Sequence, residues 1–167
     1  MKSIGSMLTV LVVALPLLIS AQTPPDNNIK WVDWNKAVTE ARQSNKIIIL
    51  ELYTDWCGWC KKMEKETFVN PEIVELLNSH FIPVRLNPED KKTLYSYQGK
   101  MVTARQLLVS LEKNTDQIKY PAILFLYPSD FSTVYSEEGY IKANSFKQLL
   151  RSHLNNLEKM TAKLSKD

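Results

Sequence analysis

Both cysteines of this 167-residue chain lie in one short run, Trp56-Cys57-Gly58-Trp59-Cys60. Two thiols separated by two residues can cycle between a dithiol and a disulfide. A helix that begins at the first cysteine would favour its thiolate, because unpaired N–H groups and the helix dipole stabilise negative charge there. A cross-link kept only for stability gains more from a long loop. The spacing therefore predicts redox chemistry rather than a structural staple.

The position of each residue in this run suggests a role. We expect Cys57 to be the nucleophile, because it would lie at the helix start and stay partly exposed. Cys60 would be sheltered one turn later and would act as the resolving thiol. Gly58 is expected to allow the tight turn. Trp56 either shields one side of the site or simply packs in the core.

Buried strands and amphipathic helices alternate on both sides of the cysteine run. Continuous apolar runs predict central strands buried on both faces, and i, i+3, i+4 spacing predicts the helices. Side-chain caps mark several helix starts, among them a capping box of Thr103 with Gln106 and a cap at Ser145. The sequence predicts helices over 33–45, 61–68, 70–77, 103–111 and 145–157, strands over 47–53, 81–86, 122–127 and 133–138, and a hairpin over 94–103.

The N-terminus has the layout of a secretory signal peptide. Lys2 is followed by the apolar stretch Met7–Ile19 and by small residues that place cleavage after Ala21. The alternative is an uncleaved anchor, but the stretch is shorter than the ~20 residues that span a bilayer, and Pro16 interrupts it. The expected organisation is a signal peptide over 1–21, a flexible lead-in over 22–30, one domain over 31–160 and a C-terminal tail over 161–167.

Composition limits the partners. Without its leader the chain keeps about 145 residues, enough for a real core, so a periplasmic or secreted domain of this size needs no disulfide staple. The formal charge of +3 is spread along the chain, and nucleic-acid binding is not expected. No metal site or cofactor is expected, since tetrahedral zinc needs four ligands. His80 and His153 are interpreted as bystanders at ordinary surface positions, and the protein as a monomer.

The order of these elements, a strand, Trp-Cys-x-x-Cys, a helix and a later proline directly before a strand, is similar to the thioredoxin superfamily. The segment 53–64, with Thr67-Phe68 and Asn70-Pro71-Glu72, resembles the branch that includes the C-terminal periplasmic domain of DsbD and exported single-domain relatives. The resemblance covers residues 31–157. It implies a thioredoxin-like three-layer α/β/α fold, with a central mixed sheet of about four to five strands, and thiol–disulfide exchange on protein disulfides.

Glu51 interrupts a strand of Ile and Leu, where a buried carboxylate is costly. Thioredoxins usually carry a buried aspartate at the matching position. The resemblance therefore implies that Glu51 accepts the proton of Cys60, with a pKa raised by desolvation. The alternative is that Glu51 lies at a solvated edge or pairs with a lysine.

Tyr120-Pro121 precedes the strand AILFLY, as the family's cis-proline loop does. The resemblance implies a cis bond that places the Tyr120 backbone beside the cysteines, ready to pair with an extended substrate. Taken alone, a proline before a strand indicates only a turn. We expect the substrate to contact five residues, which are Trp56, Gly58, Trp59, Tyr120 and Pro121.

The residues between the cysteines bear on the direction of electron flow. Strongly oxidising members of the superfamily carry a histidine there, whereas this chain has Gly58-Trp59. We therefore expect a reductase or electron carrier, supplied by a membrane electron donor similar to DsbD. The alternative is a binding or chaperone module that holds a client thiol or a soft metal such as Cu(I) without turnover.

Overall fold

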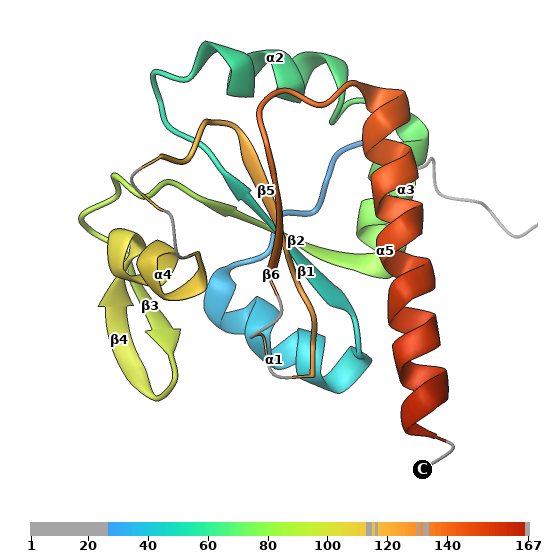
Figure 1. Cartoon of the computed structure of the whole chain (residues 1–167). Helices are drawn as coiled ribbons and strands as arrows, with labels where there is room; N and C mark the ends of the chain where they lie inside the picture. The colour runs from blue at the N-terminus through green and yellow to red at the C-terminus, as the bar shows by residue number, and fades with distance from the viewer. Residues whose placement is uncertain (1–26, 113–114, 116, 130, 132–133, 166–167) are drawn as a thin grey trace, which may run out of the picture.

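The computed structural model describes residues 27–112, 115, 117–129, 131 and 134–165. The predicted signal peptide and the first part of the lead-in lie outside the described residues. The elements follow the predicted order closely (Figure 1). They are α1 (Trp34–Ser44), β1 (Ile47–Leu52), α2 (Gly58–Glu66), α3 (Pro71–His80), β2 (Phe81–Leu86), β3 (Leu94–Tyr97), β4 (Lys100–Thr103), α4 (Ala104–Leu111), β5 (Ala122–Leu126), β6 (Val134–Glu138) and α5 (Ala143–Leu164).

The central sheet has four strands in the order β2-β1-β5-β6. β1 pairs in parallel with β2, and β5 runs antiparallel to both of its neighbours, β1 and β6. The sheet is therefore mixed, as expected. Every residue of β1 and β5 is buried, which explains why both strands read as unbroken apolar runs apart from Glu51.

Helices cover both faces of this sheet and complete a three-layer α/β/α fold (Figure 1). Alternate residues of β1 point to opposite faces. Ile48, Leu50 and Leu52 belong to the core under α1, α4 and the β3–β4 hairpin. Ile47 and Ile49 belong to the core under α2, α3 and α5. Within the part of the chain that is described, no helix is long and apolar enough to cross a membrane.

Local capping explains where most helices begin. Asp33 accepts backbone N–H groups at the start of α1, and Asn70 does so at α3, with Pro71 at the first helical position. The predicted capping box of Thr103 and Gln106 forms at α4. The prediction for the last helix was wrong: α5 begins at Ala143 after Lys142, with no side-chain cap, so Ser145 lies inside the first turn.

Candidate active site

The two cysteines form a disulfide at the start of α2. Cys57 is the N-cap residue of this helix, and its Sγ accepts the backbone N–H of Cys60 at 3.0 Å. A sulfur at this point meets the unpaired N–H groups of the first turn, which stabilise a thiolate. The helix start that the spacing predicted is therefore confirmed, and it places Cys57 where negative charge is favoured.

The expected exposure of Cys57 was wrong. Cys57 is 4% exposed and Cys60 is 2% exposed. The Cys57 sulfur is turned inward over the first turn of α2, where it is bonded to Cys60 and accepts that residue's N–H. The expected role of Gly58 in a tight turn was also wrong. Its φ lies outside the left-handed region, it is helical, and an added Cβ would meet open space.

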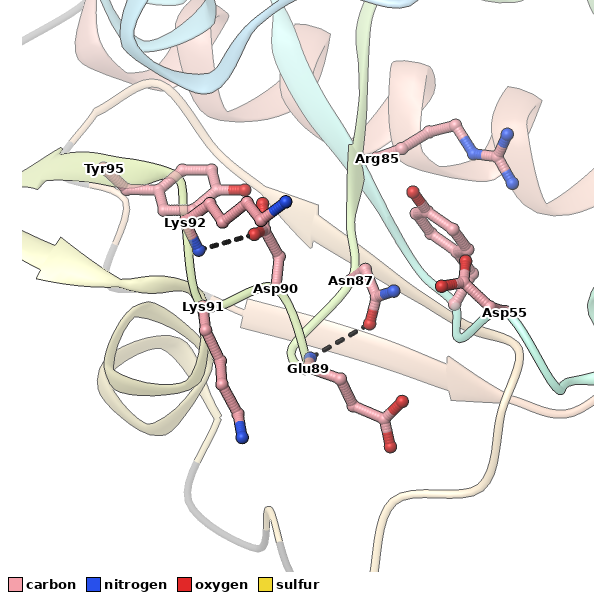
Figure 2. A pocket seen from close by; sticks show the side chains of 9 residues that line it. Asp55, Arg85, Asn87, Glu89, Asp90, Lys91, Lys92 and Tyr95 are labelled. Carbon is pink, nitrogen blue, oxygen red and sulfur yellow. Dashed lines mark hydrogen bonds between the residues drawn. The ribbon is translucent and has the colours of Figure 1, made fainter.

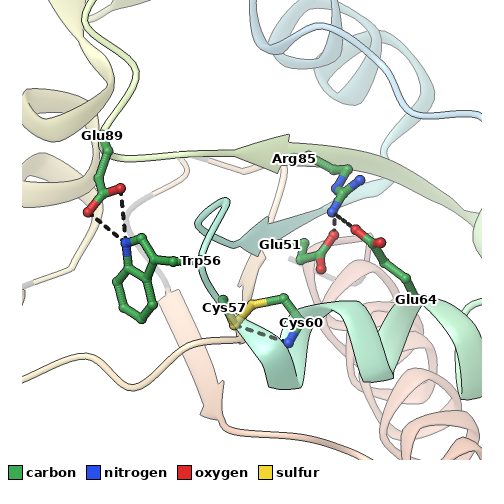
Figure 3. Close-up of a disulfide and its surroundings, with 7 residues drawn as sticks. All are labelled: Glu51, Trp56, Cys57, Cys60, Glu64, Arg85 and Glu89. Carbon is green, nitrogen blue, oxygen red and sulfur yellow. Dashed lines mark hydrogen bonds and ion pairs between the residues drawn. A yellow bond between two sulfur atoms is a disulfide. The ribbon is translucent and has the colours of Figure 1, made fainter.

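Glu51 is fully buried beneath the helix that carries the cysteines. In the view of Figure 3 its carboxylate lies between the disulfide and the guanidinium of Arg85. Burial raises the pKa of Glu51 to about 7, although the nearby Arg85 opposes this rise. The expected desolvation is thus present, and a carboxyl group with this pKa can exchange a proton near neutral pH.

Glu51 pairs with an arginine, whereas the alternative interpretation of the sequence expected a solvated edge or a lysine partner. Arg85 Nε lies 2.8 Å from Glu51 Oε2, in an ion pair that is not aligned as a hydrogen bond. The same guanidinium also contacts Glu64 of α2, through Nη2 (Figure 3). The rings of Tyr53 and Trp31 lie 4.3 and 5.2 Å from its central carbon. Arg85 is thereby held in place and shared between two carboxylates.

Trp56 lies on the surface beside the disulfide, so the core-packing alternative is excluded. Its side chain is 66% exposed, and its indole N–H donates to both carboxylate oxygens of Glu89 at 3.1 and 3.2 Å. The ring also meets Tyr120 edge-on, with centroids 6.0 Å apart. The Tyr120–Pro121 peptide bond is cis, as expected. The contact with Tyr120 brings the cis-proline loop to the cysteine turn.

A polar pocket of about 560 Å³ lies beside the loop between β2 and β3, which holds Glu89 (Figure 2). Neither cysteine lines it. The lining of the pocket carries both signs of charge. It includes the acids Asp55, Glu89 and Asp90 and the bases Lys91 and Lys92. Asp90 already accepts the N–H groups of Lys92 and Thr93. The pocket adjoins the site without containing its reactive atoms.

His153, interpreted from the sequence as a surface bystander, is buried against the sheet. It is 5% exposed, its Nδ1 lies 2.7 Å from the hydroxyl of Tyr127, and its ring stacks on Phe125 at 3.8 Å. Burial lowers the pKa of His153 to about 4. His153 lies in the third turn of α5 and therefore helps to pack this helix against the core.

Arg85, Glu64, Glu89 and Tyr140 lie around the site but were missed by sequence reasoning. Arg85 gave one usable signal, since it is a cation inside the apolar strand FIPVRL. Glu64 and Glu89 look like ordinary surface acids. Tyr140 is 81 positions from its ring partner Trp59, so only the fold brings the two rings to 5.8 Å.

The mixed sheet, the cysteine pair at a helix start and the cis-proline define a thioredoxin-like protein with a site of the thiol–disulfide oxidoreductase kind. The family model Thioredox_DsbH, described as "Protein of unknown function, DUF255", matches residues 17–166. The chain belongs to this family.

Parts of two curated proteins are similar to a segment of this chain. Spermatogenesis-associated protein 20 of Rattus norvegicus is 38% identical over 66 residues, 39% of this chain and 8% of the rat protein. The thiol:disulfide interchange protein DsbD of Escherichia coli K12 is 44% identical over 62 residues, 35% of this chain and 11% of DsbD. The match thus spans about a tenth of each relative. A solved DsbH oxidoreductase superposes with a TM-score of 0.56 at 19% identity, covering 81% of this chain and 92% of that one, which supports the fold.

Proposed function

We propose that this chain is an exported thiol–disulfide oxidoreductase that reduces protein disulfides, or carries electrons to them, through the Cys57–Cys60 couple. The observation that carries the proposal is the position of Cys57 at the N-cap of α2, with its sulfur accepting the Cys60 N–H at 3.0 Å. A thiolate generated there by reduction would be stabilised without any neighbouring histidine or lysine.

In the reduced protein, the Cys57 thiolate attacks one sulfur of the partner's disulfide. The partner's S–S bond breaks, one of its sulfurs leaves as a thiolate, and a mixed disulfide with Cys57 forms. Cys60 then loses its proton to the Glu51 carboxylate and attacks the Cys57 sulfur. The mixed disulfide breaks, the second partner thiolate leaves, and two electrons have passed to the partner.

Surrounding residues supply the other functions of the site. The backbone at Tyr120 and Pro121 would pair with the partner chain, and Trp56 and Trp59 would contact its side chains, with Gly58 leaving the space between them open. Arg85 holds the Glu51 carboxyl group in position. No cofactor takes part in this scheme, because both electrons are carried by the sulfur atoms.

The direction of electron flow rests on the residues between the cysteines. No cation lies at Gly58 or Trp59, so the reduced form lacks the extra stabilisation that makes strong oxidants. We therefore propose a reductase or carrier. In an oxidising compartment it would need electrons from a membrane donor, which we propose to be similar to DsbD. The signal peptide would direct export and would then be removed by cleavage after Ala21.

Insulin reduction by dithiothreitol tests the catalytic proposal. Wild-type protein should accelerate the reaction, whereas Cys57→Ser should not, because the attacking thiolate is gone. Equal rates for the two proteins would instead support a binding module without turnover. Trapping tests the order of attack: Cys60→Ser should accumulate mixed disulfides through Cys57, and recovery of free monomer alone would contradict that order.

Two further measurements test direction and location. Equilibration with glutathione should give a reduction potential near that of thioredoxin, roughly −270 mV, and a value near −120 mV would indicate an oxidant. N-terminal sequencing of the protein recovered from a periplasmic extract should begin at Gln22. A full-length protein that remains in the membrane fraction would show an uncleaved anchor.

A further inference from the structure

Two of the four tryptophans are exposed, and they lie on either side of Cys57 in the sequence. Trp56 is 66% exposed and Trp59 is 59% exposed, whereas Trp34 is 2% exposed and Trp31 is half-buried. Large aromatic side chains left on a surface in this way are typical of contact sites. Their position next to Cys57 makes them the first side chains that an attacking partner would meet.

The Trp59 side is fixed by a clamp between α2 and the loop that follows β6. Trp59 packs against Tyr140 with ring centroids 5.8 Å apart, and the Tyr140 hydroxyl donates to Glu66 at 2.7 Å. Lys62 pairs with the same Glu66 at 2.6 Å. Beneath them, the Thr67 hydroxyl donates to the carbonyl of Ile141 at 2.6 Å. The Tyr140 ring is therefore held in place before any partner arrives.

The Trp56 side is fixed in a similar way. Its indole N–H is bonded to Glu89, and the backbone N–H of Glu89 is in turn bonded to the side chain of Asn87 at 2.9 Å. Tyr120 supports the other edge of the ring. The Trp59 side and the Trp56 side are thus both pre-organised, which lowers the entropy cost of binding a partner between them.

The geometry of a disulfide limits where the residues next to a partner's cysteine can lie. In a disulfide the two Cα atoms are about 4.4–6.8 Å apart, and the next residue along a chain lies about 3.8 Å further. When a partner cysteine is bonded to Cys57, the Cα atoms of its two neighbours therefore lie within about 11 Å of the Cys57 Cα, within reach of the exposed rings of Trp56 and Trp59. A neighbour with an apolar ring would gain an aromatic contact there, whereas a charged neighbour would lose hydration.

Resting on the proposed function, we infer that Trp59 and Tyr140 form a specificity wall. The preferred partner is an extended polypeptide whose disulfide-bonded cysteine is flanked by large apolar or aromatic side chains. Lys62, which lies 5.5 Å from the centre of the Tyr140 ring, pairs with Glu66, so the charges beside the wall balance each other. Oxidised glutathione, with a carboxylate on each side of its cysteine, is a poor fit to this surface.

Single-turnover reduction of two matched peptide disulfides tests the inference. The substrates are disulfide-linked peptides identical except for Phe-Cys-Phe or Ser-Cys-Ser at the centre, with oxidised glutathione as a third substrate. Released thiol is measured after mixing with pre-reduced protein. The wild type should favour the Phe peptide by roughly tenfold, the size expected for aromatic contacts. The ratio of the two rates is independent of any change in reduction potential.

Single substitutions distinguish a role of Trp59 and Tyr140 in substrate preference from effects that any surface substitution would have on the rate. Trp59→Ala and Tyr140→Ala should each reduce the Phe-to-Ser ratio at least threefold, and Trp59→Phe should retain most of it. Met160→Ala, an exposed apolar residue near the far end of α5, is the control and should leave the ratio unchanged. Trp59 lies at the surface, so an unchanged melting temperature is expected for its variants. Tyr140 is half-buried against the core, so Tyr140→Ala should lower the melting temperature, and the ratio of the two rates remains its readout.

The outcomes distinguish this inference from the proposed function. If the wild type reduces none of the three disulfides, the proposed function fails. If it reduces both peptides at equal rates, or if Trp59→Ala keeps the full preference, the function stands and the specificity wall is overturned. A drop in the ratio for Met160→Ala as large as that for Trp59→Ala would also overturn the wall.

Discussion

Glu51 and Arg85 are register partners on the parallel strands β1 and β2, and Arg85 Nε lies 2.8 Å from Glu51 Oε2. The cation does not keep the acid ionised, because burial outweighs its attraction and Glu64 shares the guanidinium. The pKa of Glu51 is consequently about 7, so this carboxyl group both accepts and releases protons near neutral pH.

Glu51→Gln should slow the resolution of the mixed disulfide. The amide fills the same space but cannot accept the proton of Cys60, so we expect a loss of roughly 100-fold at pH 7, at the low end for acid–base catalysis. In the wild type the rate of resolution should rise with pH through about 7, as Glu51 loses its proton. Stopped-flow measurement of this step from pH 5 to 9 checks both points. An unchanged profile in the variant would refute the proton-acceptor role.

Arg85→Met should raise the pKa of Glu51 further. Removing an opposite charge from a buried acid leaves desolvation unopposed, so the midpoint of the pH–rate profile should move upward by about one unit or more. Lys147→Met is the matched control, because Lys147 pairs with Glu72 on α3 instead. A midpoint that stays in place in Arg85→Met, or that moves as much in the control, would show that Arg85 does not set this titration.

His153 should make the protein less stable in acid. Its pKa is about 4 in the folded protein and about 6.5 when unfolded, so the unfolded state binds more protons between these values. This contribution is complete above pH 6.5 and is lost as the pH falls towards 4, by up to about 3 kcal/mol. Glu51, whose pKa is raised, acts in the opposite sense between about 4.5 and 7.

Urea unfolding of His153→Phe from pH 4 to 8 isolates the histidine's share. The free energy of unfolding of wild type minus variant should fall as the pH drops from 6.5 to 4, because the phenylalanine has no proton to bind. His80→Asn is the control, since His80 lies at the exposed end of α3. If the difference between wild type and His153→Phe is flat across this range, the buried histidine is not the acid-sensitive group.

Thr67→Val should destabilise the fold by about 1–3 kcal/mol. The change keeps the side-chain shape but leaves the buried Ile141 carbonyl without the hydroxyl that donates to it at 2.6 Å. Thr67→Ser should keep most of the stability. Thr39→Val, at an exposed position in α1, should change the free energy of unfolding by less than about 0.5 kcal/mol. Equal effects at positions 67 and 39 would argue against the clamp.

Local patterns were sufficient for most of the fold. Strands β1 and β5 are apolar, apart from Glu51, because both of their faces are buried, and a window of a few residues is enough to show this signal. Caps at Asp33, Asn70 and Thr103 use side chains within three residues of the groups they bind. The start of α5 was misplaced because Lys142 has no capping side chain, so no local signal marks it.

The sequence by itself determined the chemistry of this protein: two thiols at a helix start, one acid in a buried strand, and a proline before a strand. These follow from residue type and short spacing, which act locally. The tertiary structure decided what surrounds them. It paired Glu51 with Arg85, tied Trp56 to Glu89, set Tyr140 against Trp59 and turned His153 into the core. Each of these contacts joins segments at least 26 positions apart, and such distances are closed only when the sheet and its helices pack.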